Sequence, residues 1–234
     1  MFYDLHIHSA LSPCADDEMT PNNIANMAKL KGLNLISITD HNAIGQVLVM
    51  EEVLRKLDIS LVFGVEVQTV EEVHILCYFK AYHELELFYK ALQSNLVVIR
   101  NDEAYFGNQL LLNAMDEVIG KEEKLLLTSV NWGLEELEHQ VHLYHGAFVI
   151  AHALDRLNSI TTQLGFIPKQ LKFDGIEVKD EEEKMKCLAL NPWIEETIWL
   201  YNSDAHRLIE IHDAEYQIDR LTLNKLWRGS CYKT

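Results

Sequence analysis

Short apolar segments of strand length recur along the chain, and most of them end in a histidine or a carboxylate. The first, residues 2–7, is apolar apart from Asp4 and His6. The run at 33–39 is almost continuously apolar, which is typical of a strand buried on both faces. Further predicted strands lie at residues 60–67, 72–79, 147–151, 174–178 and 197–201.

Helical segments alternate with these strands. Thr20 and Pro21 have the form of an N-cap followed by proline at the first helical position, and this helix ends at Gly32. The other predicted helices cover residues 45–57, 84–99, 134–144 and 215–227. This alternation predicts an α/β architecture with a parallel sheet. About seven strand–helix units fit, slightly short of the roughly 250 residues typical of an eight-unit barrel.

One stretch interrupts this regular pattern. Residues 100–132 are weakly periodic, and Gly107 and Gly120 indicate turns. We expect this segment to form helical insertions or a cap over one end of a single domain that covers residues 1–234. We also expect it to influence the choice of substrate.

Composition narrows the class of protein. Apolar residues make up 48% of the chain, enough for a substantial core. The formal charge of −16, from 36 acidic and 20 basic residues, disfavours a broad face for long nucleic acid, although a narrow basic groove stays open. Bound cations would offset part of this charge.

Cysteine usage and hydropathy indicate the compartment. The four cysteines (Cys14, Cys77, Cys187 and Cys231) are scattered with no C-x-x-C pair, so neither a disulfide framework nor a cysteine zinc knuckle is expected. The start of the chain lacks the features of a signal peptide. No apolar run approaches the roughly 18 residues of a membrane span. We therefore expect a soluble, cytoplasmic protein.

Residues that can bind metal gather at the ends of the predicted strands. His6 and His8 are two apart in a strand, so their side chains face the same side. The candidate ligands are His6, His8, Asp16, His41, Glu66, His74, His152, Asp204 and His206. Most follow the C-terminal end of a strand, where parallel barrels build active sites. His74 starts a strand instead, which an antiparallel excursion beside the barrel would accommodate.

The number and type of these ligands suggest catalysis. At about four protein ligands per ion, nine candidates suit two or three divalent ions. Structural zinc sites are usually closed by four ligands and favour cysteine. Histidines and carboxylates with positions left for water favour hydrolysis, because ions lower the pKa of water and neutralise charge on a phosphoryl group. A single buried histidine, taken alone, is more often a satisfied core residue.

Several other side chains have more than one interpretation. Arg156 is the first candidate to bind phosphate and Arg207 the second, although each is equally a surface arginine. We expect Asp40 to orient a ligand imidazole, with a simple loop-start aspartate as the alternative. Glu177 would hydrogen-bond substrate or a ligand, or serve structure alone. A further set on a predicted helix, expected to form an exposed polar face, contains His139, His142 and His145.

Five motifs in order along the chain carry a family resemblance. They are DLHIH (4–8), TDHN (39–42), GVEV (64–67) with VHIL (73–76), IAH (150–152) and NSDAH (202–206). This set resembles the polymerase and histidinol phosphatase (PHP) family of metal-dependent phosphoesterases. The resemblance implies a distorted (β/α)7 TIM-like barrel, with a trinuclear centre of zinc, manganese or iron at the C-terminal ends of the strands. Where many members have His-Pro, this chain has His152-Ala153.

The resemblance also assigns ligands to each ion. One ion would be bound by His6, His8 and Asp204, and Glu66 would bridge it to a second ion. The second ion would be completed by His74 and His152. The third would be bound by Asp16, His41 and His206. Asp17 is the adjacent alternative to Asp16, which is preferred because its spacing to Thr20-Pro21 resembles that in the family.

The activity implied is hydrolysis of a small phosphomonoester, such as a sugar, nucleotide or amino-alcohol phosphate, by a metal-activated hydroxide. Glu66, Asp204 and His206 would take catalytic roles. One alternative is a nuclease or phosphodiesterase acting on oligonucleotide ends. The other is a non-catalytic, metal-binding regulatory barrel. The sequence leaves the oligomeric state open.

Overall fold

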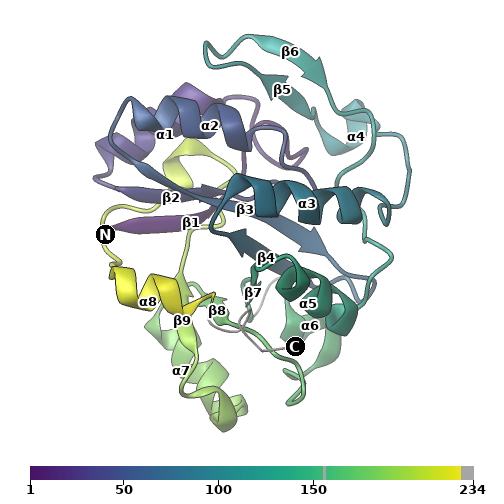
Figure 1. The fold of residues 1–234 in the computed structure, drawn as a ribbon, viewed down its shortest axis with the longest axis vertical. Coiled ribbons are helices and arrows are strands. Elements are labelled where there is room, and N and C mark those ends of the chain that lie inside the picture. Colours follow the sequence, from purple (N-terminus) through teal and green to yellow (C-terminus); the bar gives the residue numbers. More distant parts are fainter. Residues whose placement is uncertain (155–156, 228–234) are drawn as a thin grey trace.

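Seven strands form one strongly curved sheet in the protein (Figure 1), whose computed structural model describes residues 1–154 and 157–227. In spatial order they are β1 (Tyr3–Ile7), β2 (Leu35–Ile38), β3 (Ser60–Gln68), β4 (His74–Phe79), β7 (Ala147–Ile150), β8 (Gly175–Val178) and β9 (Ile198–Tyr201). A parallel bridge joins Ile7 to Ala205, just beyond β9. This bridge nearly closes the sheet and confirms the predicted distorted, seven-stranded α/β barrel.

β4 runs antiparallel to both of its neighbours, β3 and β7, whereas the other pairs within the sheet are parallel. The predicted excursion beside the barrel was therefore wrong in its position, because β4 lies inside the sheet. The short connection 69–73 joins β3 to β4, and Gln68 at the end of β3 is paired with His74 at the start of β4. Since β4 is reversed, its first residue lies at the same end of the barrel as the carboxyl ends of the parallel strands.

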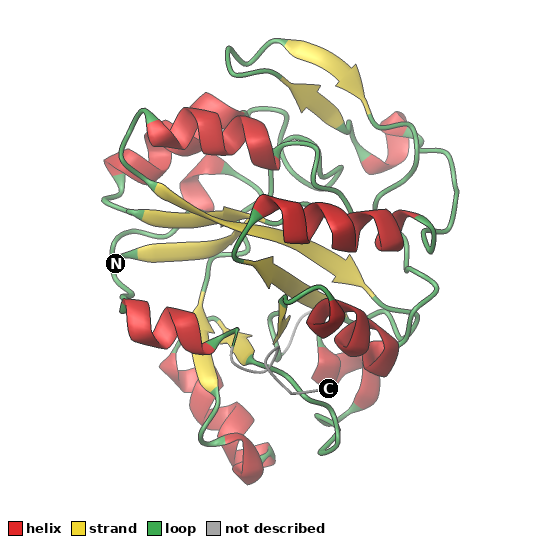
Figure 2. Ribbon diagram, in the orientation of Figure 1, coloured by secondary structure: helices red, strands yellow, loops and turns green. Residues whose placement is uncertain are grey.

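Helices lie around the outside of the sheet, as Figure 2 shows. They are α1 (Pro21–Leu30), α2 (Val47–Arg55), α3 (Tyr82–Gln93), α5 (Leu134–Leu143), α6 (Ile160–Leu164), α7 (Glu181–Leu190) and α8 (Arg220–Lys225), with 3-10 turns at Pro192–Ile194 and Leu208–Glu210. The start of α1 follows the prediction, because the Thr20 side chain accepts a hydrogen bond from the Asn23 N–H. α8 is shorter than predicted, because Asp219 forms its N-cap.

The segment 100–132 consists mainly of loops and turns, and the helices expected there are limited to α4 (Glu103–Phe106). It contains the antiparallel pair β5 (Leu110–Leu112) and β6 (Val118–Lys121), which lies beside α1 and α2 (Figure 1). The turn of this hairpin is held by Asp116, whose carboxylate accepts hydrogen bonds from Thr20 and from the N–H and side chain of Asn22. These bonds attach the hairpin to the N-terminus of α1.

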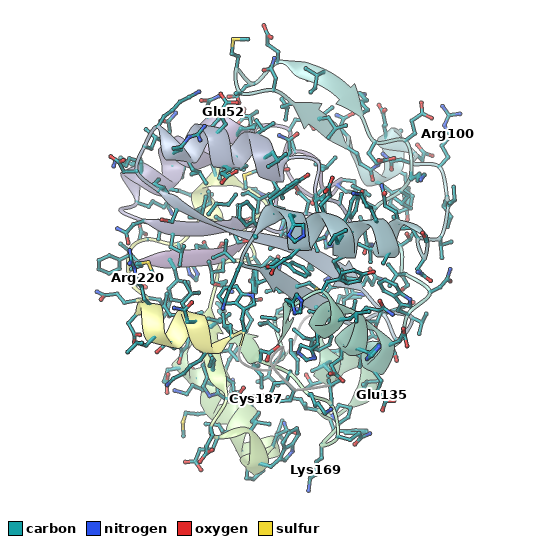
Figure 3. All side chains as sticks on the ribbon, in the orientation of Figure 1. Glu52, Arg100, Glu135, Lys169, Cys187 and Arg220 are labelled. Carbon is teal, nitrogen blue, oxygen red and sulfur yellow. The ribbon has the colours of Figure 1, made fainter. Side chains whose placement is uncertain are left out.

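Apolar side chains fill the space between the sheet and the surrounding helices (Figure 3). The largest buried side chains include Phe79, Phe88 and Phe148. Inside the barrel, the Tyr78 hydroxyl donates to the Leu5 carbonyl at 2.7 Å, so strands on opposite sides of the curve are joined directly. None of the helices in the described ranges is long and apolar enough to cross a bilayer.

Candidate metal centre

Eight of the nine predicted ligands meet at one end of the barrel. His6 and His8 come from the end of β1, and His41 follows β2. Glu66 lies near the end of β3 and His74 begins the antiparallel β4. The remaining members follow β7 and β9 and are His152, Asp204 and His206. Because these residues lie far apart in the sequence, the closing of the sheet is what brings them together.

Glu66 is the centre of this group. It is 1% exposed, and neither of its carboxylate oxygens has a hydrogen-bond partner of good geometry among the described residues. Five imidazole nitrogens surround it, those of His41 at 2.9 Å, His74 at 3.1 Å, and His6, His8 and His152 at 3.4 Å. A buried carboxylate without hydrogen-bond donors is costly unless cations compensate it. Divalent ions between Glu66 and the imidazoles would supply this compensation.

The spacing of the ligand atoms also fits metal ions. Nε2 of His6 and Nε2 of His8 lie 3.1 Å apart, and Oδ1 of Asp204 lies 3.3 Å from each. At metal–nitrogen distances of about 2.0–2.1 Å, atoms bound to one ion at octahedral or tetrahedral angles lie roughly 2.8–3.4 Å apart. These three side chains, with Glu66 beside them, therefore fit a shared ion.

Hydrogen bonds to the ring nitrogens that point away from the cluster determine which nitrogen of each histidine faces it. In four of the histidines, one ring nitrogen lies at hydrogen-bond distance from an oxygen. The pairs are His6 Nδ1 with Glu177 (3.0 Å), His8 Nδ1 with Ser12 (3.0 Å), His74 Nε2 with Gln68 (3.2 Å) and His206 Nδ1 with the Asp204 carbonyl (2.8 Å). Each of these nitrogens donates, so the opposite nitrogen is the one that faces the cluster and would bind a metal ion, as in metal-bound imidazoles.

Asp40 and Glu177 support the ligands rather than joining them. Asp40 accepts hydrogen bonds from the N–H and hydroxyl of Ser9 and from the Ser12 hydroxyl. Since Ser12 donates to Asp40, its oxygen accepts from His8, so Asp40 orients the His8 imidazole through Ser12. Glu177 contacts His6 directly. Both arrangements agree with the roles considered from the sequence.

Two ligands have an unusual backbone conformation. His152 and Asp204 have positive φ angles of 26° and 53°, and each lies shortly after a strand. This region is uncommon for residues other than glycine and concentrates at functional sites. Here it turns the chain back immediately beyond β7 and β9, so both side chains reach the cluster around Glu66.

The electrostatics of the group favour cation binding. Burial raises the pKa of Glu66, but the charges of His74, His6 and His41 outweigh burial and hold that pKa well below its ordinary value. Burial lowers the pKa of His8, and His206 and His41 lower it further. The carboxylate is therefore ionised and the His8 imidazole neutral at pH 7. Burial lowers the pKa of His6 and of His41, but the neighbouring carboxylates, with Cys14 for His41, outweigh burial and raise both pKa values well above the ordinary value, so protons on these rings compete with metal ions for the same nitrogens.

A second set of ligand atoms includes a residue that the sequence analysis had set aside. Cys14 offers its sulfur within 4.8 Å of nitrogens of His8, His41 and His206. Desolvation raises the pKa of the Cys14 thiol, but His41 and hydrogen bonds with His206 and His41 outweigh it and lower the pKa to about 7. The sequence feature that could have identified Cys14 is its position six residues after His8, in the loop that follows the first motif.

Asp16, predicted to bind the third ion, lies elsewhere. It is exposed, and its carboxylate belongs to none of the clusters of potential ligands found among residues 1–154 and 157–227. Its backbone N–H donates to the His206 carbonyl at 3.0 Å. This bond ties the loop to the end of the barrel and leaves the Asp16 side chain at the rim.

The cluster opens into two hollows that share Cys14, Asp204 and His206. One, of about 380 Å³, is completed by His41, His74, Leu127, His152, Leu157 and Asn158. The other, of about 600 Å³, is lined by Asp16, Lys179, Asn202, Ser203, Arg207, Glu210 and His212 as well. Arg207, predicted to bind substrate, is therefore beside the cluster, as is Lys179, which the sequence analysis missed. Arg156 lies outside the described residues.

Comparison with proteins of known sequence gives two partial matches. A 5'-3' exoribonuclease of Haemophilus influenzae is 32% identical over 77 residues, which are 32% of this chain and 27% of that protein. An uncharacterized protein of Methanocaldococcus jannaschii is 33% identical over 76 residues, 29% of this chain and 44% of that protein. The matches thus span less than half of either relative.

Solved structures share the fold at low sequence identity. The lesion-specific endonuclease EndoQ of Pyrococcus furiosus matches with a TM-score of 0.65 and 21% identity, over 88% of this chain and 48% of that one. A protein of Bifidobacterium adolescentis described as a metal-dependent phosphoesterase matches with a TM-score of 0.61 and 17% identity, over 96% and 94%. An amidohydrolase of Chromobacterium violaceum with bound sulfate matches with a TM-score of 0.61 and 19% identity, over 97% and 96%.

The PHP domain family matches residues 4–161, which are more than half of the chain and contain the motifs from His6 to His152. Since the barrel and the histidine–carboxylate cluster agree with this match, the chain belongs to the PHP domain family of metal-dependent phosphoesterases.

Proposed function

We propose that the protein hydrolyses a small phosphomonoester, such as a sugar, nucleotide or amino-alcohol phosphate. The observation that carries the proposal is the opening of the cluster around Glu66 into a hollow of about 380 Å³. This volume lies within the range of roughly 300–1,000 Å³ that small-molecule sites occupy. The hollow has both apolar walls, including Leu127 and Leu157, and polar groups from the cluster.

Two or three divalent ions, of zinc, manganese or iron, would be held by the residues described above. Beside His41 and His206, where Asp16 was expected, lies Cys14. When bound, such ions supply Lewis acidity that activates water and offsets charge on the phosphoryl oxygens. Glu66 and Asp204 supply fixed negative charge that positions them. His206 lies at the edge of both hollows, where its Nε2 either binds an ion or donates a proton to the leaving alcohol.

The cationic side chains lie in the larger hollow. Lys179 and Arg207 both line it, next to Asp204 and His206. Arg207 also forms an exposed ion pair with Glu210 at 3.6 Å. We assign these two cations to the binding of substrate phosphate, because lysine binds phosphate as a point charge and arginine in a fork.

A second candidate function is cleavage of a phosphodiester at the end of an oligonucleotide. The two hollows share Cys14, Asp204 and His206, so an extended substrate has room on both sides of the cluster. The names of the exoribonuclease and the lesion-specific endonuclease among the similar proteins support this class of reaction. The net charge of −16 opposes the binding of a long polyanion, which favours short substrates.

The test is phosphate release by the manganese- or zinc-loaded protein across a panel of small phosphomonoesters, with a 5'-phosphorylated oligonucleotide and a dinucleotide included. An Asp204→Ala variant removes a ligand, and Asp213→Ala is the matched control at an exposed position. We expect phosphate from at least one small ester, lost in Asp204→Ala and kept in Asp213→Ala. Release of nucleotides alone would replace this proposal with the second candidate. Bound metal with no hydrolysis would favour a regulatory role.

A further inference from the structure

We propose that Cys14 binds metal as a thiolate and that its site, formed with His41 and His206, prefers a thiophilic divalent ion such as Zn²⁺ over Mn²⁺ or Mg²⁺. The inference concerns the metal centre of the proposed function. It holds whichever phosphoester the protein hydrolyses, because it specifies the donor atoms and not the substrate.

The geometry supplies four donors around one point. The sulfur of Cys14 and one nitrogen each of His8, His41 and His206 lie within 4.8 Å of one another. The rings converge from three segments of the chain, with centroids 4.3 Å apart for His8 and His206 and 4.5 Å apart for His8 and His41. A thiolate and imidazoles are the donor types of tetrahedral zinc sites.

The loop that carries Cys14 is built to hold it in this position. The Ala15 N–H donates to the Ser12 carbonyl at 3.0 Å, which closes a four-residue turn with Pro13 in its second place and Cys14 in its third. Proline favours that second place because its φ angle is already suited to it. The Ser12 side chain is anchored on Asp40, so the turn is attached to the same support that orients His8.

The other end of the loop is fixed as well. The Asp16 N–H donates to the carbonyl of His206, one of the proposed partners of Cys14. The turn and this bond together hold the Cys14 sulfur toward the imidazoles and leave the Asp16 carboxylate exposed. The carboxylate that the family pattern suggested for this ion is thus replaced by sulfur two residues earlier in the chain.

Sulfur changes which ions the site prefers. Thiolate is a soft ligand that favours zinc and other thiophilic ions, whereas Mn²⁺ and Mg²⁺ prefer carboxylates and water. His8 also faces Glu66 and Asp204, so it lies between the Cys14 site and the group formed by His6, Glu66 and Asp204. If His8 serves the ion of that group, Cys14, His41 and His206 provide three ligands and leave a fourth position open, as in catalytic zinc sites.

Cobalt substitution tests the proposal without relying on activity. Co²⁺ bound to thiolate gives a sulfur-to-cobalt charge-transfer band in the near ultraviolet, which nitrogen and oxygen ligands do not give. We would measure this band, and the cobalt and zinc bound per chain, in the wild type and in Cys14→Ser, Cys14→His and Asp16→Asn. Circular dichroism would establish that each variant is folded.

We expect the band in the wild type and in Asp16→Asn. Cys14→Ser should lose the band and one equivalent of ion, and Cys14→His should recover that equivalent without the band, because imidazole replaces the thiolate. The inference is overturned if the wild type carries its full cobalt without the band, or if Cys14→Ser keeps the band. A protein that shows the band but hydrolyses no ester would contradict only the proposed function.

Selectivity provides a second measurement. With zinc and manganese offered together, Cys14→Asp should shift the bound ions toward manganese relative to the wild type, because the substitution replaces a soft donor with a hard one. An unchanged ratio of zinc to manganese in this variant would contradict the assignment of the thiolate as the source of the preference.

Discussion

Both carboxylate oxygens of Glu177 lie 3.0 Å from Nδ1 of His6. The same carboxylate accepts hydrogen bonds from the His152 N–H at 2.9 Å and from the Asn202 side chain at 2.7 Å. Burial raises the pKa of Glu177, but the charge of His6 and its hydrogen bond outweigh burial and lower that pKa. Glu177 is therefore an ionised acceptor that directs Nε2 of His6 toward Glu66.

We expect Glu177→Gln to weaken metal binding by about 10–100-fold, the usual effect of removing a hydrogen bond that orients a ligand histidine. The substitution keeps the shape of the side chain but replaces one acceptor with a donor, which then faces His6, His152 or Asn202. Competition with a chromophoric chelator measures the affinity. Glu182→Gln, at an exposed position on α7, is the control and should bind metal like the wild type. Equal affinities of the two variants would refute the role of Glu177.

We expect Lys179→Met to raise the KM for a phosphorylated substrate by about tenfold, equivalent to ~1.4 kcal/mol. The change should leave kcat within about twofold, because Lys179 lines the hollow beside the cluster without belonging to the ligand groups. Methionine keeps the length of the side chain and removes its charge. Steady-state kinetics of this variant and of Lys186→Met, an exposed control on α7, separate the two parameters. A loss in kcat alone would place Lys179 in the chemical step.

The fold was predictable because its strands are marked by nearly pure apolar composition. All seven predicted strands overlap the observed ones, and the cluster around Glu66 follows from the rule that parallel strands present their carboxyl ends together. α7 was missed because its apolar residues follow no helical period and only Cys187 is buried along it. The hairpin at 110–121 was missed because short, locally paired strands on the surface carry little periodic signal.

The candidate site was predictable only where regular elements position it. Strand ends place His6, Glu66 and His74, so alternation along the strand was sufficient. Loops place Cys14 and Asp16, and there spacing cannot distinguish which side chain turns inward. Which side chain turns inward depends on the turn that begins at Ser12 and on the hydrogen bond from the Asp16 N–H to the His206 carbonyl. The pattern of polar and apolar residues predicts neither of these.

Gly107, directly after α4, packs the segment 100–132 against the loop that carries Cys14. Its φ angle is 104°, and a Cβ atom there would lie 2.1 Å from the Pro13 carbonyl oxygen. We therefore expect Gly107→Ala to lower the free energy of unfolding by about 2–4 kcal/mol, from backbone strain together with overpacking. Urea unfolding measures this loss.

Gly165 is the matched control for this substitution. Its φ angle is 80°, but a Cβ atom there meets nothing within 4 Å. Gly165→Ala should therefore cost only the strain of a left-handed backbone, about 1 kcal/mol. If both variants lost the same stability, close packing on Pro13 would have no part in the effect. A larger fall in cobalt affinity for Gly107→Ala than for Gly165→Ala would link the packing to the metal centre.

His142 differs from His139 on α5 (Leu134–Leu143), which is exposed as predicted for the polar face. His145, predicted to share that face, is also exposed but lies beyond the end of α5 with a positive φ angle of 61°. His142 is half-buried and lies 2.8 Å from both Glu138 and Asp174. Burial lowers its pKa, but the hydrogen bond and charge of Asp174, followed by those of Glu138, outweigh burial and raise the pKa above the ordinary 6.5. Its protonated form is therefore bound more strongly in the folded state than in the unfolded state.

The stability from protonated His142 is fully present below the unfolded pKa of about 6.5 and is lost as the pH rises through the higher folded value. We expect His142→Gln to reduce the free energy of unfolding by about 1 kcal/mol more at pH ~5.5 than at pH ~8.5, the scale of a charged hydrogen bond. Urea unfolding at both pH values measures this difference, in which metal-dependent contributions common to wild type and variant cancel. His139→Gln should show no such dependence. If the loss of unfolding free energy in His142→Gln were larger at the higher pH, Asp174 and Glu138 would bind the neutral imidazole instead.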